Sequence, residues 1–261
     1  MLSGPEDRLA SLVANARELV ECGYYSDTRA SGKRERPSMA AALRDPSDYP
    51  IVAEVKLASP TGGRLSAHLA EELIEDFRLG GAAALSVLTE PRYFRGSLRY
   101  LEMAVRTGLP VLMKDFVVDD RQVEAAARAG ASAVLLIEGA FDRGMAFGRD
   151  GLISHAHGLG LEVVLEASDL QEVEAARASE ADILAYNRRD LRTFRPGPDL
   201  LEEALGALRA DGRPSLAMSL MASAEDVRRA RDLGASGVLV GSALSTAPCP
   251  RDRLRALRVG R

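Results

Sequence analysis

The sequence predicts an α/β protein, a single (β/α)8 TIM barrel with an N-terminal helical extension. Short apolar runs typical of buried strands occur eight times between residues 51 and 241. Amphipathic stretches with helical spacing lie between several of these runs. The length of 261 residues also suits one barrel domain, since such barrels commonly need about 250 residues. An open, doubly wound sheet fits the same pattern, but no G-x-G-x-x-G turn follows the first run to favour it.

The N-terminal 50 residues are expected to form a helical extension packed on the barrel. A stripe of apolar side chains recurs there at helical spacing and comprises Leu9, Leu12, Val13, Ala16, Leu19 and Val20. Ser31–Pro37 is typical of a solvated loop, and it carries Lys33. We therefore expect the extension over residues 1–50 and the barrel over residues 51–261, together forming one domain.

Eight strands are expected, because each run is apolar throughout and lacks the polar alternation of a half-exposed sheet. In chain order they are Ile51–Leu57, Ala83–Thr89, Val111–Lys114, Ala133–Ile137, Glu162–Glu166, Asp182–Asn187, Ser215–Ser219 and Gly237–Gly241. Helices are expected at Leu69–Leu79, Asp120–Ala129, Asp169–Ala178 and Ser223–Leu233. Ser168, Asp169 and Ser223 supply the side-chain oxygens that cap helix starts.

A sequence pattern that occurs three times supports a repeating helix–strand unit. Gly81, Gly130 and Gly234 each follow a predicted or apolar helical stretch and precede a buried strand by a few residues. Glycine adopts the left-handed conformation that ends a helix without a Cβ penalty. The recurrence is what a barrel of like units requires.

Composition restricts the function classes. The formal net charge of −4 leaves no basic excess for nucleic acid, and no apolar run reaches the roughly 18 residues of a membrane span. The N-terminal residues lack a signal-peptide pattern, so a cytoplasmic protein is expected. The two cysteines, Cys22 and Cys249, lie near opposite ends of the chain and form neither the pattern of a disulfide framework nor that of a metal cluster, and His155 and His157 face different sides of a helix. We expect no metal site, and the sequence leaves the oligomeric state open.

Lysine is scarce in this chain. Of the 34 basic residues only Lys33, Lys56 and Lys114 are lysine, and the rest are arginine. Arginine stays charged, whereas lysine can release a proton and its pKa can be shifted. Two of the three lysines stand where a predicted strand ends, which is where a parallel barrel places its active site.

The polar residues at the predicted strand ends form the candidate site. They are Glu54, Lys56, Ser59, Lys114, Asp115, Glu166, Asn187, Arg189, Ser219 and Ser242, and Gly241 adjoins the last of them. Lysine and glutamate can act as general acid and base, and a lysine can also form a Schiff base. The pairs Glu54–Lys56 and Glu166–Lys114 could instead only hold the barrel rim together. Backbone N–H groups after the last strand suit an anion such as phosphate.

Six motifs resemble the indole-3-glycerol phosphate synthase family of tryptophan biosynthesis. They are AEVKLASP (53–60), SVLTEPRYFRGS (86–97), VLMKDFVVDDRQV (111–123), AVLLIEG (133–139), VVLEASD (163–169) and AYNRRDL (185–191). The resemblance implies a ring-closing lyase that releases CO2 and water from a small phosphorylated substrate, 1-(o-carboxyphenylamino)-1-deoxyribulose 5-phosphate, and that uses no cofactor or metal.

The resemblance also implies roles for individual residues. Lys114 is then the general acid at the ketone oxygen, Glu166 the general base, and Lys56 the cation that holds the substrate carboxylate or phosphate. Glu54 and Asn187 orient these groups, and Arg189 adds positive charge. The remaining implied residues form an apolar pocket, made of Phe94, Phe116, Leu135 and Leu191, and a phosphate side, made of Ser59, Ser219, Gly241 and Ser242.

One segment departs from the family pattern. The seventh predicted strand ends in Met218-Ser219-Leu220, where family members usually have Glu-Ser-Gly. The change removes a carboxylate and adds a side chain where the backbone would approach phosphate. Besides the synthase, four alternatives follow: a relative with altered substrate, a barrel of low activity, a Schiff-base aldolase of the same fold, and an inactive binding protein.

Overall fold

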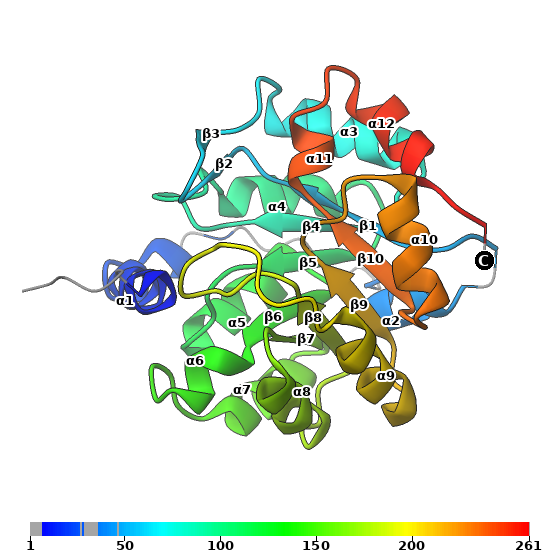
Figure 1. Ribbon diagram of the computed structural model, residues 1–261. Coiled ribbons are helices and arrows are strands. Elements are labelled where there is room, and N and C mark those ends of the chain that lie inside the picture. The colour runs from blue at the N-terminus through cyan, green and yellow to red at the C-terminus, as the bar shows by residue number, and fades with distance from the viewer. Residues whose placement is uncertain (1–6, 27, 29–35, 46, 261) are drawn as a thin grey trace, which may run out of the picture.

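The computed structural model of the protein describes residues 7–26, 28, 36–45 and 47–260. Eight parallel strands close into a barrel in the order β1-β10-β9-β8-β7-β6-β5-β4 (Figure 1). Their bounds are β1 (Ile51–Val55), β4 (Ala84–Leu88), β5 (Val111–Lys114), β6 (Ala133–Ile137), β7 (Glu162–Ala167), β8 (Ile183–Asn187), β9 (Ser215–Met218) and β10 (Gly237–Val240). Because β1 pairs with both β4 and β10, the sheet has no edges. The predicted barrel is confirmed and the open sheet is excluded.

The strand bounds agree with the predicted ones to within two residues, and the largest difference is at the first strand. β1 ends at Val55 rather than Leu57, because the chain then turns into a small antiparallel hairpin that the sequence analysis missed. The hairpin pairs β2 (Ala58–Ser59) with β3 (Gly63–Arg64). Two-residue strands leave no periodicity to detect.

Helices surround the barrel and cover the outer face of its strands (Figure 1). They are α3 (Ala70–Gly80), α4 (Leu98–Val105), α5 (Asp120–Ala129), α6 (Glu138–Asp142), α7 (Arg149–Gly158), α8 (Leu170–Arg177), α9 (Leu201–Asp211), α10 (Ala224–Asp232), α11 (Ser242–Ser245) and α12 (Pro250–Leu257). The four predicted helices are confirmed as α3, α5, α8 and α10. Gly81, Gly130 and Gly234 have the expected positive φ of 86°, 86° and 94°.

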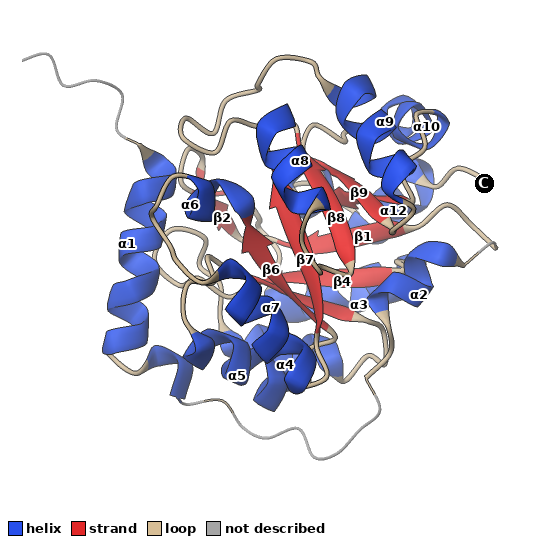
Figure 2. Cartoon of the chain, turned by 90° about the horizontal axis from the view of Figure 1, so that it is seen from below, coloured by secondary structure: helices blue, strands red, loops and turns tan. Residues whose placement is uncertain are grey.

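The segment before β1 holds three further elements, α1 (Arg8–Glu21), the 3₁₀ turn η1 (Tyr24–Ser26) and α2 (Met39–Arg44). The predicted apolar stripe is the buried face of α1. This helix lies beside α6 at the carboxyl ends of the strands, while α2 lies at the opposite end of the barrel (Figure 2). Arg8 binds there to carbonyl groups of two loops that follow strands, donating from N to Arg192 O at 3.0 Å and from Nη1 to Pro60 O at 3.2 Å. Lys33 and most of its predicted loop lie outside the described residues.

Two apolar layers stabilise this arrangement. One fills the space between the strands and the outer helices, with Phe77, Leu101 and Tyr186 among its fully buried members. The other fills the barrel interior below the mouth and includes Val52 and Leu216. The polar residues at the strand ends therefore lie directly above a buried apolar layer. Among the described helices, none has the length and apolar character needed to cross a membrane.

Candidate active site

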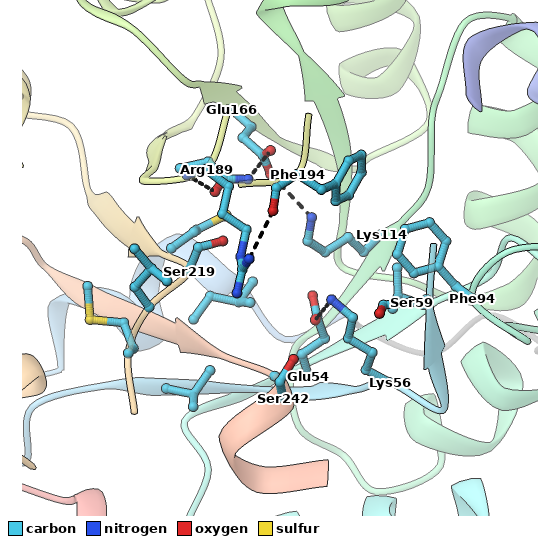
Figure 3. Close-up of a pocket in the computed structure, with 18 of the residues that line it drawn as sticks. Glu54, Lys56, Ser59, Phe94, Lys114, Glu166, Arg189, Phe194, Ser219 and Ser242 are labelled. Atoms are coloured by element: carbon cyan, nitrogen blue, oxygen red, sulfur yellow. Dashed lines mark hydrogen bonds and ion pairs between the residues drawn. The ribbon is translucent and has the colours of Figure 1, made fainter. Parts of the chain in front are cut away.

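A cavity of about 390 Å³ opens where the strands end. Every residue that the sequence analysis placed in the site lines this cavity. Lys56, Lys114, Glu54 and Glu166 come from β5, β7 and the region of β1, and their charged ends point into the shared space (Figure 3). The structure thus brings together residues up to 188 positions apart in sequence, from Glu54 to Ser242.

Lys114 and Glu166 form the inner pair of charges. Lys114 Nζ lies 3.2 Å from Glu166 Oε2, and the Glu166 side chain is only 1 % exposed. Asn187 Nδ2 donates to the other carboxylate oxygen at 2.8 Å. Both oxygens of Glu166 therefore have a partner, and the carboxylate is fixed facing the lysine.

The protonation state of Lys114 follows from these neighbours. Burial lowers the pKa of its ammonium group, but the Glu166 and Glu54 carboxylates outweigh burial and hold that pKa above the ordinary 10.5. The group is therefore an ammonium at neutral pH.

Glu54 and Lys56 form the second pair. They lie two residues apart and face the same side, with Lys56 Nζ 3.6 Å from Glu54 Oε1. Lys56 Nζ also lies 5.6 Å from the centre of the Phe94 ring. Gly241 leaves room for this pair, because a Cβ at that position would lie 2.3 Å from Glu54 Oε1. A buried charge without a partner is costly, so Glu54 and Lys56 stabilise each other while the cavity holds no ligand.

An aromatic wall stands beside the lysines. The rings of Phe94 and Phe116 lie 6.0 Å apart with an interplanar angle of 32°. The buried carboxylate of Glu90 fixes the loop that carries Phe94, since it accepts N–H groups from Arg92, Tyr93 and Phe94 at 2.7 to 3.0 Å. This wall and the nearby Leu135 and Leu191 suit a flat apolar group.

Arg189 is the third cation at the cavity. Its backbone N donates to Asn187 Oδ1 at 3.0 Å, and its Nη1 donates to Phe194 O at 3.0 Å. Within the described residues no carboxylate forms an ion pair with this guanidinium. Its charge is available to an anionic ligand.

The end of β9 has an unusual backbone. Ser219 and Leu220 both have positive φ, at 65° and 57°, which a non-glycine residue rarely adopts. The Met218 side chain is buried and lines the cavity. The site therefore has a thioether and a strained leucine at the two positions where the resemblance led us to expect a carboxylate and a glycine.

Several cavity residues had no signal in the sequence analysis. They are Thr61, Gly62, Leu65, Leu88, Ile137, Phe194, Met221, Ala222, Leu239, Val240 and Ala243. Some belong to the β2–β3 hairpin or to loops, whose course no periodicity reveals. Asp115, which the sequence places at a strand end without a role, also lines the cavity. Among the described residues no group of three His, Cys, Asp or Glu side chains is placed to hold a metal ion.

A closed parallel barrel with two lysine–carboxylate pairs in its mouth is typical of enzymes of the (β/α)8 class. Comparison with known proteins specifies it further, since the family model described as indole-3-glycerol phosphate synthase matches residues 7–257. The chain belongs to the indole-3-glycerol phosphate synthase family. A relative of that name from Carboxydothermus hydrogenoformans is 40% identical over 210 residues, covering 79% of this chain and 78% of the relative. One from Burkholderia cenocepacia is 38% identical and covers 95% and 97%.

Solved structures show the same fold at much lower identity. An N-acetylmannosamine-6-phosphate 2-epimerase from Clostridium perfringens superposes with a TM-score of 0.63 at 16% identity, covering 83% of this chain and 95% of that one. A thiamine phosphate pyrophosphorylase from Pyrococcus furiosus gives 0.59 at 17%, covering 80% and 93%. At this identity the likeness extends to the fold alone.

Proposed function

We propose that the protein is a carboxy-lyase that closes the indole ring of 1-(o-carboxyphenylamino)-1-deoxyribulose 5-phosphate, giving indole-3-glycerol phosphate, CO2 and water in tryptophan biosynthesis. The observation that carries the proposal is the Lys114–Glu166 pair, at 3.2 Å, inside a cavity with an aromatic wall and two further cations. Ring closure with loss of water needs one group that gives a proton and one that takes a proton.

The first step forms a carbon–carbon bond. The aromatic carbon that carries the carboxylate attacks the ketone carbon, and Lys114 Nζ gives a proton to the ketone oxygen. The carbon–carboxylate bond then breaks, its electrons restore the aromatic ring, and CO2 leaves. An alkoxide is a far stronger base than an amine, so proton transfer from Lys114 is favourable despite the raised pKa of that lysine.

The second step removes water. Lys114, reprotonated from solvent, gives a second proton to the new hydroxyl group, which leaves as water, while Glu166 takes a proton from the neighbouring methylene carbon. Two protons are thus given and one is taken, so each turnover consumes one proton from solvent, because the substrate carboxylate leaves as CO2. Glu166 lies within hydrogen-bonding distance of Lys114 and returns its proton to the lysine. Asn187 orients the Glu166 carboxylate for this exchange through its 2.8 Å hydrogen bond.

Binding is divided between the walls of the cavity. The anthranilate ring lies against Phe94, Phe116, Leu135 and Leu191, which places its carboxylate near the Lys56 ammonium beside the Phe94 ring. Ser59, Ser219, Gly241 and Ser242 serve the phosphate, and Arg189 adds charge. Glu54 orients Lys56 through their ion pair.

The test is conversion of the substrate by the purified chain. We expect indole fluorescence to appear and one CO2 to be released for each indole formed, at the same rate with and without EDTA. Borohydride added during turnover should leave no substrate mass on Lys56 or Lys114. Absence of product at high enzyme concentration overturns the proposal, and a reduced adduct favours the Schiff-base aldolase instead.

A further inference from the structure

A buried carboxylate that the proposed reaction does not use follows Lys114 directly. Asp115 is 1 % exposed. Its Oδ2 accepts hydrogen bonds from Tyr25 Oη at 3.0 Å and Thr89 Oγ1 at 2.5 Å, and its Oδ1 accepts the Phe116 N–H at 2.8 Å. Among the described residues, these donors are neutral hydroxyl and amide groups. Burying a carboxylate without a cation is costly, so its retention calls for a reason.

The donors come from two different elements. Tyr25 belongs to η1, in the segment that precedes the barrel, whereas Thr89 directly follows β4. Thr89 N also donates to Lys114 O at 3.3 Å, and Thr89 O accepts from Tyr24 Oη at 2.8 Å. The backbone of Lys114 is therefore held by the hydrogen bond from Thr89 N. It is also held through the next residue, because Tyr25 and Thr89 both donate to Asp115, and we call these two hydrogen bonds the clamp.

The chain beyond Asp115 is held as well. Gln122 is fully buried, donates from Nε2 to Phe116 O at 3.1 Å and accepts from Val118 N at 2.8 Å. The chain is thus held by hydrogen bonds from Lys114, the last residue of β5, to Val118. The long lysine side chain therefore extends from a backbone that is hydrogen-bonded on both sides, which favours its contact with Glu166.

We propose that Asp115 is a positioning residue that joins Tyr25 and Thr89 to the end of β5 and so sets where the Lys114 ammonium lies. The inference rests on the proposed function, in which Lys114 is the proton donor. Asp115 acts through Lys114 and Phe116 and transfers no proton itself. The segment before the barrel thereby contributes to the geometry of the site through one tyrosine hydroxyl.

The electrostatic setting of Asp115 agrees with this role. Burial raises its pKa to about 6, although the hydrogen bonds from Thr89, Phe116 N and Tyr25 act in the opposite direction. The titratable groups around it are Tyr24 and Tyr25 from η1, Glu90 after β4, and the adjoining Lys114. At neutral pH the carboxylate is ionised and accepts hydrogen bonds from both hydroxyl groups.

The test compares Asp115→Asn with Tyr25→Phe, using the full chain. We expect Asp115→Asn to lower kcat about tenfold to a hundredfold with KM changed less than threefold. The alkaline limb of the pH profile of kcat/KM should move to lower pH in this variant, because the Lys114 ammonium is no longer held in contact with the Glu166 carboxylate. Tyr25→Phe should lower kcat about threefold to tenfold. The double variant should be no slower than Asp115→Asn alone, since both changes remove the same contact.

Control variants distinguish a failure of the positioning role from a failure of the proposed function. Tyr93→Phe removes a tyrosine hydroxyl from a side chain that is 41% exposed, and it should behave as the parent. Lys114→Ala tests the proposed function: if it keeps full activity, that function is wrong and not merely the clamp. If Lys114→Ala is inactive while Asp115→Asn keeps kcat within threefold and an unmoved alkaline limb, the clamp is refuted. Should Asp115→Asn not fold, Tyr25→Phe decides by the same criteria.

Discussion

Replacing Lys114 by arginine separates proton donation from positive charge. Lys114 Nζ lies 3.2 Å from Glu166 Oε2, and arginine can keep an ion pair with that carboxylate. Arginine holds its protons up to a pKa above about 12 and cannot give one up at useful rates. Lys114→Arg therefore preserves the charge of the site and removes the chemistry.

The magnitude follows from the contribution of a positioned proton donor. Such groups accelerate reactions by about 10²–10⁴-fold, which corresponds to about 3–5 kcal/mol of barrier. Lys114→Arg should lose that factor in kcat and melt near the parent temperature. Lys114→Ala should lose as much in kcat and also stability, because it leaves the 1 % exposed Glu166 with Asn187 as its remaining partner. Breaking a buried ion pair in this way costs about 3–5 kcal/mol.

The assay is steady-state formation of indole fluorescence, with thermal melting measured on the same samples. Lys33→Arg, at the lysine outside the described residues, is the matched control and should retain full activity. A Lys114→Arg variant within threefold of the parent kcat would show that charge alone suffices, and proton donation by Lys114 would be refuted.

Four further predictions concern other parts of the site. Glu166→Gln keeps the size of the side chain but cannot take a proton, so kcat should fall by about 10²–10⁴-fold while substrate binding by calorimetry persists; unchanged kcat would remove Glu166 from the mechanism. Gly241→Ala would place a Cβ 2.3 Å from Glu54 Oε1 and displace that carboxylate from Lys56, so KM should rise several-fold, and an unaltered KM would show that the Glu54–Lys56 geometry is unimportant. Leu220→Gly relieves a φ of 57° and opens the backbone, so KM for the phosphorylated substrate should fall, whereas a rise would indicate that the leucine itself contacts substrate. The pKa of Asp115 is raised from 3.8 to about 6, so ionisation of this group destabilises the folded state as the pH rises through that window. Urea unfolding should therefore show that the free energy of unfolding of Asp115→Asn, relative to the parent, rises on the order of 3 kcal/mol between pH 4 and pH 7. A pH-independent difference would contradict the assignment.

The sequence predicted the barrel and the charged residues that line one cavity, because both depend on local signals. Val111–Lys114 and Ala133–Ile137 match their strands to the residue, since an apolar run bounded by glycine or polar residues defines a buried strand. Glu54, Lys56, Lys114 and Glu166 stand at strand ends, and a closed parallel barrel brings all strand ends together.

Other features were missed because they depend on tertiary contacts. The β2–β3 hairpin is too short to leave a pattern, and the positive φ of Leu220 has no sequence signal in a residue that seldom adopts it. The clamp on Asp115 joins Tyr25 and Thr89, which are 64 positions apart in the chain. The division into residues 1–50 and 51–261 remains a prediction, whereas α1 and α2 are part of the described fold.

The scarcity of lysine allows a direct measurement of the central pair. A chain labelled with 13C at the lysine side chains has only three lysines to observe, and lysine-to-arginine variants assign their signals. Titration followed by NMR should give Lys114 a pKa above the ordinary 10.5, and that pKa should fall in Glu166→Gln because the partner charge is lost. A Lys114 signal that titrates at or below 10.5 and ignores Glu166→Gln would contradict the account.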